Sequence, residues 1–109
     1  PFSDQKGKKV RPVMVISNNE FNKNSEDLLV VGVTSNLSRN KYAVILTNKD
    51  MEEGRLLDEC CAKSENILKI EKEIVIKKIG RIKKEKFSQI VSRIFEIIKW
   101  KLNLTKKQT

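Results

Sequence analysis

The 109-residue sequence contains no histidine. This absence excludes the Ser–His–Asp and Cys–His catalytic arrangements, the paired-histidine ribonuclease mechanism and most zinc sites. Long apolar runs are also missing, so no segment is predicted to span a membrane, and no signal peptide is visible. With four Phe, one Tyr and one Trp, the chain has few aromatic platforms. This scarcity disfavours a general single-strand binder that stacks bases on aromatic rings.

Cysteine is equally scarce, since only Cys60 and Cys61 are present and they are neighbours in the sequence. Adjacent cysteines cannot cross-link a fold, and two thiols alone do not complete a tetrahedral metal site. We therefore expect reduced thiols in a cytoplasmic protein, and neither a metal nor another cofactor. On a strand, one thiol would point inward and the other outward. Both are interpreted as small apolar side chains rather than as reactive groups.

The abundant residues are the basic ones. Lys and Arg together number 23 against 14 acidic residues, which gives a net charge of +9. The corresponding pI is about 9.7. A small domain of this charge is typical of proteins that bind a polyanion, usually nucleic acid. The alternative is that the lysines only make the surface more soluble.

Through most of the chain, short apolar runs are separated by segments rich in turn-forming residues, and this pattern predicts short strands. Gly32 interrupts one of these strands, and such a glycine indicates a bulge or a close backbone approach. Loops are expected over residues 1–11, 18–27 and 35–40, and a turn over 48–53 closes at Gly54. The expected strands span 12–17, 28–34, 42–47, 55–62, 67–70 and 74–82.

The pattern changes after Lys84, where apolar residues recur every three or four positions. This period predicts an amphipathic helix from Lys84 to about Leu102, without an ideal capping residue at its start. The predicted fold is therefore mainly β with a C-terminal helix (α+β), as a small barrel. We expect one domain over residues 1–109.

A first group of candidate residues lies where a loop enters a strand. Lys8 and Lys9 precede Arg11, and Pro12 restrains Arg11 to an extended conformation. A guanidinium fixed at a sheet end can bind a phosphate through two hydrogen bonds. The alternative is a solvated basic loop.

A second group, Thr34, Ser35 and Asn36, follows the strand that contains Gly32. Hydroxyl groups at a strand end can donate to phosphate oxygens, although they can equally cap the next turn. Lys63 and Glu65 form a third group, because residues two apart on a strand face the same side. A carboxylate there can act as a general base, or the two can form an ordinary exposed ion pair.

The order of these features resembles the PemK/MazF family, the toxin components of type II toxin–antitoxin pairs. The resemblance extends from about residue 1 to residue 100. The stretches GKKVRPVMVIS, VGVTS and GRI carry it most strongly, at residues 7–17, 31–35 and 80–82. It implies a small SH3-like barrel, usually a homodimer, that works in the cytoplasm with an acidic antitoxin as partner.

The resemblance also implies an activity that requires no metal. Family members cleave single-stranded RNA, including mRNA, through attack by the 2′-hydroxyl, and leave 2′,3′-cyclic phosphate and 5′-hydroxyl ends. The key arginine and threonine of the family fall on Arg11 and Thr34. An arginine and an aspartate that some members use fall on Lys63 and Glu65, so both are replaced. The first strand of the family is expected to be missing ahead of residue 1.

The candidate residues suit this chemistry without reference to the family. Arg11 would clamp the phosphorane oxygens or protonate the leaving 5′-oxygen, and Thr34 would donate hydrogen bonds to the same oxygens. Glu65 would accept the 2′-proton. The substrate-binding candidates are Lys8, Lys9, Ser35, Asn36 and Lys63. Two alternatives remain open: a non-catalytic nucleic-acid-binding barrel, and a toxin of this fold that acts on a protein such as gyrase.

Overall fold

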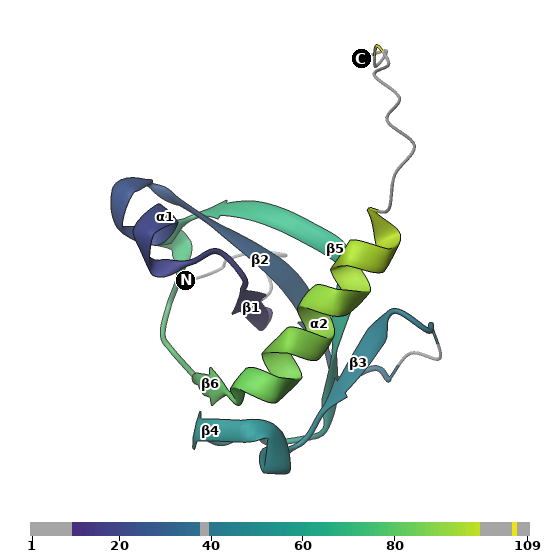
Figure 1. Ribbon diagram of the computed structural model, residues 1–109. Coiled ribbons are helices and arrows are strands. Elements are labelled where there is room, and N and C mark those ends of the chain that lie inside the picture. Colours follow the sequence, from purple (N-terminus) through teal and green to yellow (C-terminus); the bar gives the residue numbers. More distant parts are fainter. Residues whose placement is uncertain (1–9, 38–39, 99–105, 107–109) are drawn as a thin grey trace.

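The computed structural model describes residues 10–37, 40–98 and 106 of the chain. Its main sheet is antiparallel and has the strand order β1-β2-β5-β3, in which the long β2 and β5 lie side by side and curl into a half-barrel (Figure 1). A second sheet pairs β4 with β6. The strands are β1 (Val13–Val15), β2 (Asp27–Thr34), β3 (Ala43–Leu46), β4 (Met51–Gly54), β5 (Cys60–Glu71) and β6 (Gly80–Ile82).

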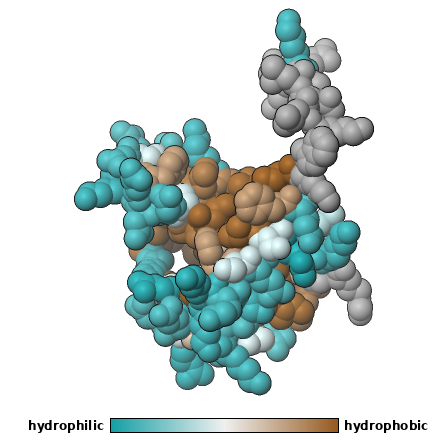
Figure 2. Space-filling view, in the orientation of Figure 1, coloured by the Kyte–Doolittle hydropathy of each residue, from teal (hydrophilic) through white to brown (hydrophobic). Residues whose placement is uncertain are grey.

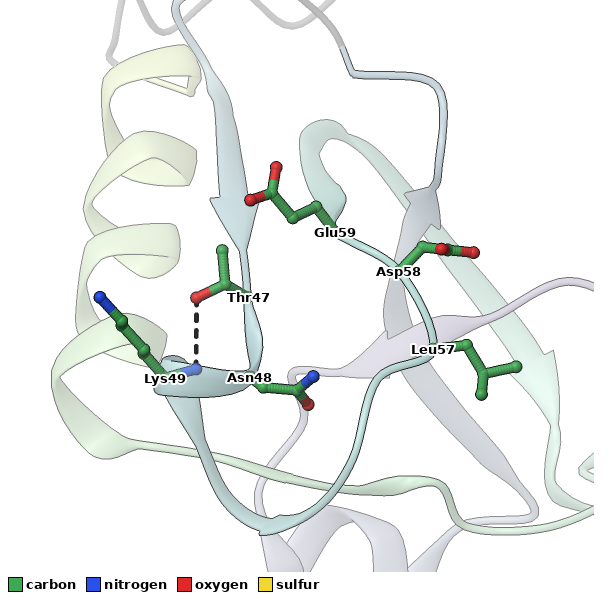
Figure 3. A pocket seen from close by; sticks show the side chains of 6 residues that line it. All are labelled: Thr47, Asn48, Lys49, Leu57, Asp58 and Glu59. Carbon is green, nitrogen blue, oxygen red and sulfur yellow. Dashed lines mark hydrogen bonds between the residues drawn. The ribbon is translucent and has the colours of Figure 1, made fainter.

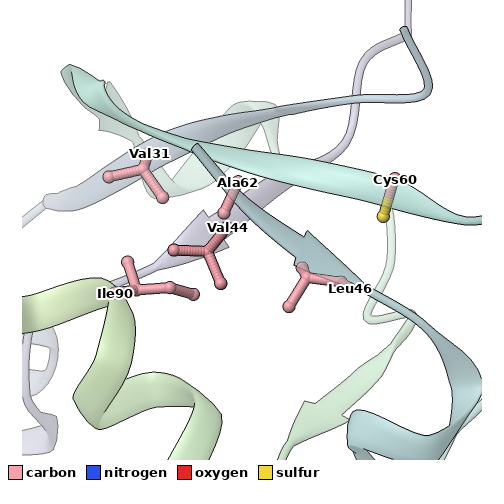
Figure 4. Close-up of a cluster of buried hydrophobic side chains, with 6 residues drawn as sticks. All are labelled: Val31, Val44, Leu46, Cys60, Ala62 and Ile90. Carbon is pink, nitrogen blue, oxygen red and sulfur yellow. The ribbon is translucent and has the colours of Figure 1, made fainter. Parts of the chain in front are cut away.

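The helix α2 (Lys84–Ile97) packs against β5 and β3 and covers the inner face of the main sheet. Ile90 is fully buried between them. Its partners come from alternate positions of three strands, since every second side chain of a strand points to the same face. The core that results consists of Val31, Val44, Leu46, Cys60, Ala62 and Ile90 (Figure 4). The predicted mainly β fold with a C-terminal helix is thus confirmed.

The predicted helix is correct over the residues that the structure describes, and residues 99–102 lie outside them. Its first turn follows Lys83, whose side chain makes no capping hydrogen bond, as the sequence indicated. At the other end, the N–H of Ile98 donates to the carbonyl of Ile94. No helix in the described part of the chain is long and apolar enough to cross a membrane.

Three strand predictions in the C-terminal half were wrong in extent. The segments expected at 55–62 and 67–70 form one strand, β5, and residues 55–59 precede it as a loop. Asn48 holds this loop through two hydrogen bonds to Leu56, which donates to the Asn48 Oδ1 (2.7 Å) and accepts from its Nδ2 (3.0 Å). The strand expected at 74–82 is reduced to β6, after a 3₁₀ turn η2 (Lys72–Ile74).

Two segments that were predicted to be a loop and a turn contain regular secondary structure. The helix α1 (Asn19–Asn24) occupies part of the expected loop, and the Asn18 side chain caps it by accepting from the Phe21 N–H. The expected turn at 48–53 contains a 3₁₀ turn η1 (Asn48–Asp50) followed by β4. Gly54 ends β4 with φ of +80°, and a Cβ there would lie 2.8 Å from the Cα of Gly80. Glycine at this position therefore permits the close pairing of β4 with β6.

Candidate functional site

The end of β2 brings Arg11 of the first candidate group close to Thr34 of the second. Val13 pairs with Gly32, and the Val33 N–H donates to the carbonyl of Pro12 at 3.2 Å. One further step of the same antiparallel register sets Arg11 opposite Thr34. Arg11 is exposed, whereas Thr34 is half-buried. The Arg-Pro loop and the end of β2 therefore meet at one place, although they are more than twenty residues apart in the sequence.

The side chains of this place lie on the outer face of the main sheet, which we call the site face. Val31 and Ala62 point to the core, so their strand neighbours Gly32, Thr34 and Lys63 point to the site face. Gly32 pairs with Lys63, which makes Lys63 the diagonal neighbour of Thr34. Such diagonal neighbours are about 7 to 8 Å apart, within reach of a long side chain.

The Thr34 hydroxyl accepts a hydrogen bond within the chain, while its own proton stays free to be donated. Its Oγ1 accepts the N–H of Asn36 at 3.0 Å, which fixes the turn that follows β2. The capping role offered as an alternative is therefore present. A hydroxyl accepts two hydrogen bonds and donates one, so the Thr34 proton remains available to a ligand. Ser35 and Asn36 are exposed beside it.

The two cysteines are free and buried, as the sequence suggested. Cys60 points into the core, and Cys61 lies on the opposite face of β5, where its Sγ approaches the carbonyl of Asn36 at 3.9 Å. Burial, followed by the neighbouring Cys61, raises the pKa of the Cys60 thiol. Because the thiolate is the reactive form, this shift disfavours Cys60 as a nucleophile.

Lys63 and Glu65 form an ion pair, with 3.8 Å between Nζ and Oε2. Their side chains are 39% and 35% exposed, so this pair contributes little to stability. Both lie at a bulge of β5, where the register with β2 shifts between Val31 and Gly32. The bulge accommodates three residues: Ser64, which is buried, and Glu65 and Asn66, which are exposed.

The third residue of the bulge, Asn66, was missed by the sequence interpretation. A Cβ on Gly32 would lie 3.3 Å from the Asn66 Cγ and closer still to its Nδ2. The Asn66 amide thus covers Gly32 on the site face. The bulge predicted at Gly32 is confirmed by the register shift, but what approaches the glycine is the Asn66 side chain and not another backbone.

Lys8 and Lys9 lie outside the described residues. Among the described residues, no group of three or more Cys, Asp or Glu side chains is arranged to hold a metal ion. The site face carries Thr34, Lys63, Glu65 and Asn66, with Arg11 just before β1 and Ser35 exposed in the turn after β2. This set offers cations and hydrogen-bond donors beside one carboxylate, which suits a phosphodiester.

A separate open hollow lies between the end of β3 and the loop before β5 (Figure 3). It contains none of the predicted site residues. Asp58 and Glu59 contribute two carboxylates against the single cation of Lys49, and Leu57 is fully exposed at its rim. This balance of charge disfavours a phosphate ligand, so we place the candidate site on the site face.

Comparison with known proteins gives a family match over most of the chain. Residues 1–98 match the family described as the PemK-like, MazF-like toxin of type II toxin–antitoxin systems. No curated protein sequence matches the chain.

Solved structures give a consistent result for the fold. One similar structure is the Mycobacterium tuberculosis toxin MazF-mt6, with 13% identity, a TM-score of 0.72, and coverage of 84% of this chain and 89% of that one. Another is an endoribonuclease in complex with its cognate antitoxin from a mycobacterial species, with 18% identity, a TM-score of 0.72, and coverage of 87% and 88%. At these identities the likeness establishes the fold alone.

Proposed function

Because the chain belongs to the PemK-like, MazF-like family of type II toxins, we propose that it is an endoribonuclease that cleaves single-stranded RNA without a metal ion. Its substrates would include mRNA, and the products would carry 2′,3′-cyclic phosphate and 5′-hydroxyl ends. Endoribonucleases of mycobacterial species share the fold. The observation that supports the proposal is the β1–β2 register, which the Val33–Pro12 hydrogen bond continues past Val13 and which, one step further, would set Arg11 opposite Thr34.

The proposed reaction needs charge stabilisation and one proton acceptor. The Arg11 guanidinium can hold the scissile phosphate through its N–H donors and stabilise the negative charge of the phosphorane. The free proton of Thr34 donates to the same oxygens, and Ser35 adds a second hydroxyl. Lys63, a diagonal neighbour of Thr34, supplies a further positive charge.

Bond changes follow directly from this arrangement. Glu65 accepts the proton of the 2′-hydroxyl, and the 2′-oxygen forms a bond to phosphorus. The bond from phosphorus to the 5′-oxygen then breaks. The 5′-oxygen takes a proton from water, while Arg11 stabilises the charge that develops on it. The ion pair with Lys63 places the Glu65 carboxylate beside a cation of the site face.

We further propose that the active form is a cytoplasmic homodimer that an acidic antitoxin silences. The helix α2 leaves Phe95 and Ile98 exposed by 66% and 59%, and Figure 2 shows apolar surface beside this helix. A second copy could cover such a surface. A chain of charge +9 would attract an acidic segment toward the site face. Light scattering that reports a monomer at micromolar concentration would contradict the dimer.

Incubation of the purified protein with a long single-stranded RNA in EDTA tests the proposed activity. We expect cleavage, with cyclic phosphate and 5′-hydroxyl termini at the mapped ends. Arg11→Ala should lower the rate by about 10² to 10³, which is typical for loss of one transition-state donor. Arg55→Ala removes an exposed arginine elsewhere and serves as the matched control.

Three results would count against the proposal. RNA that stays intact in EDTA and is cut when Mg²⁺ is added would contradict the metal-independent mechanism. Full activity of Arg11→Ala would overturn the site assignment. RNA that is bound but never cut would instead indicate the non-catalytic barrel.

A further inference from the structure

The Asn66 side chain occupies a defined place on the site face. The β5 bulge removes Asn66 from regular pairing with β2, and the amide lies over Gly32, where the absent Cβ leaves room for it. Asn66 is nevertheless exposed to solvent. An exposed asparagine is usually free to rotate, whereas this one fills the space that a Cβ on Gly32 would occupy.

The Asn66 amide has no partner within the described part of the chain. No hydrogen bond or ion pair of those residues engages it. An amide offers two donor hydrogens and an acceptor oxygen at a fixed spacing. This combination matches the edge of a nucleobase, and asparagine pairs with adenine in this way in many complexes. Arg11 and Lys63, by contrast, would bind phosphate oxygens, and contacts with phosphate carry no sequence information.

The amide also lies at a suitable distance from the proposed scissile phosphate. Gly32 and Thr34 are two residues apart on β2 and point to the same face, so about 7 Å separates their side-chain positions. A phosphate held between Arg11 and Thr34 would bring an adjoining nucleotide close to Gly32. In single-stranded RNA the bases are splayed out and can be read along their edges.

We propose that Asn66 determines sequence preference by hydrogen bonding the edge of one base beside the cleaved phosphate. This inference rests on the proposed ribonuclease function. It assigns base recognition to the β5 bulge, separately from the phosphate chemistry of Arg11 and Thr34. Gly32 takes part as a positioning residue, because any side chain there would displace the amide.

Cleavage of an RNA pool with randomised positions, followed by sequencing of the new ends, tests the assignment. For Asn66→Ala we expect the base preference at one position beside the cut to fall by about 5- to 100-fold. Preferences at all other positions should be unchanged. Asn24→Ala, which alters an exposed asparagine of α1, is the matched control and should retain the parental preferences.

Gly32→Ala provides an independent arm, because it displaces the amide without removing it. Gly32→Ala should weaken the base preference at the same position of the RNA as Asn66→Ala does. Asn66→Asp keeps the shape but only accepts hydrogen bonds, so it should shift that position toward bases that present an amino group. Thermal unfolding of each variant establishes that it is folded, and Asn66→Ala, at an exposed position, is the variant that decides.

The outcomes separate this inference from the proposed function. Parental protein that cuts RNA, with an Asn66→Ala variant that keeps every base preference, overturns the base-reading role and leaves the ribonuclease intact. An equal loss of cleavage at all sequences also overturns it, since that result would place Asn66 in catalysis or folding. Parental protein that cuts no RNA overturns the proposed function and, with it, this inference.

Discussion

Thr34 illustrates how much of the site depends on single atoms. Its oxygen fixes the next turn through the Asn36 N–H, and its proton is still free for a ligand. The sequence presented capping and ligand binding as alternatives, but one hydroxyl can do both. Arg11 and Thr34 could be picked out from the sequence because the Arg-Pro junction and the strand end are local patterns. Asn66 could not, because its position depends on the register of two strands.

Glu65→Gln separates proton transfer from substrate binding at the residue scale. The substitution keeps the shape of the side chain and removes its capacity to accept the 2′-proton. We expect the single-turnover cleavage rate to fall by about 10² to 10⁴, the usual contribution of a general base. RNA affinity should stay the same or rise, because one negative charge leaves the site face.

The affinity is best measured with an RNA whose 2′-hydroxyls are methylated, since it cannot be cleaved. Glu20→Gln, an exposed carboxylate of α1, is the control for the loss of one negative charge. An unchanged cleavage rate in Glu65→Gln would reduce Glu65 to an ion-pair partner of Lys63.

At the scale of elements, β2, β3 and α2 could be predicted closely because each buries a regular apolar pattern. β5 could not be predicted as one strand, since its bulge interrupts the alternation at Ser64–Asn66. β4 has two consecutive glutamates and a poor strand propensity. It forms because it pairs with β6. Glu53 forms an ion pair across the two strands with Arg81 at 3.7 Å and another at 3.5 Å with Lys78, which precedes β6.

α1 escaped prediction for a related reason. Its asparagine-rich sequence is typical of loops, and it has only six residues. One local and one distant contact stabilise it. The Asn22 side chain donates to the Ser17 carbonyl at 3.0 Å, and the Asn22 backbone carbonyl accepts from Lys72 at 2.6 Å. No periodic pattern of residues in the sequence predicts such contacts.

Ile90→Ala tests the role of α2 in closing the half-barrel. Ile90 is fully buried against Val44 and Ala62, so its truncation leaves a cavity in the core. We expect the free energy of unfolding to fall by about 2 to 5 kcal/mol, as measured by urea denaturation. Ser92→Ala, on an exposed position of the same helix, should change it by less than about 0.5 kcal/mol. Equal effects of the two substitutions would show that α2 is not anchored through Ile90.

At the scale of the whole molecule, ion pairs within the chain do not explain why basic residues are in excess. All described pairs are between at least partly exposed side chains, and 23 basic residues outnumber 14 acidic ones. Exposed pairs of this kind add little to stability. The excess of positive charge is better explained by its attraction for an anionic partner, which falls as salt screens it.

Salt dependence therefore measures which cations contact RNA. Each phosphate that a single-stranded RNA places on a cation contributes about −0.7 to the slope of log K against log salt. Lys63→Gln should make this slope shallower by about 0.7, because Lys63 lies on the site face next to Thr34. Lys23→Gln, on the exposed side of α1, should leave the slope unchanged. The binding assay again uses an RNA that cannot be cleaved.

Loss of Lys63 also leaves Glu65 without its ion-pair partner, and the free carboxylate would repel RNA by itself. The double variant Lys63→Gln/Glu65→Gln removes this repulsion. It should bind more tightly than Lys63→Gln at every salt concentration while keeping the same shallower slope, since the number of phosphates in contact is unchanged. A slope that stays at the parental value in both variants would show that Lys63 contacts no RNA phosphate. The approach of RNA would then have to be sought among the other cations of the molecule.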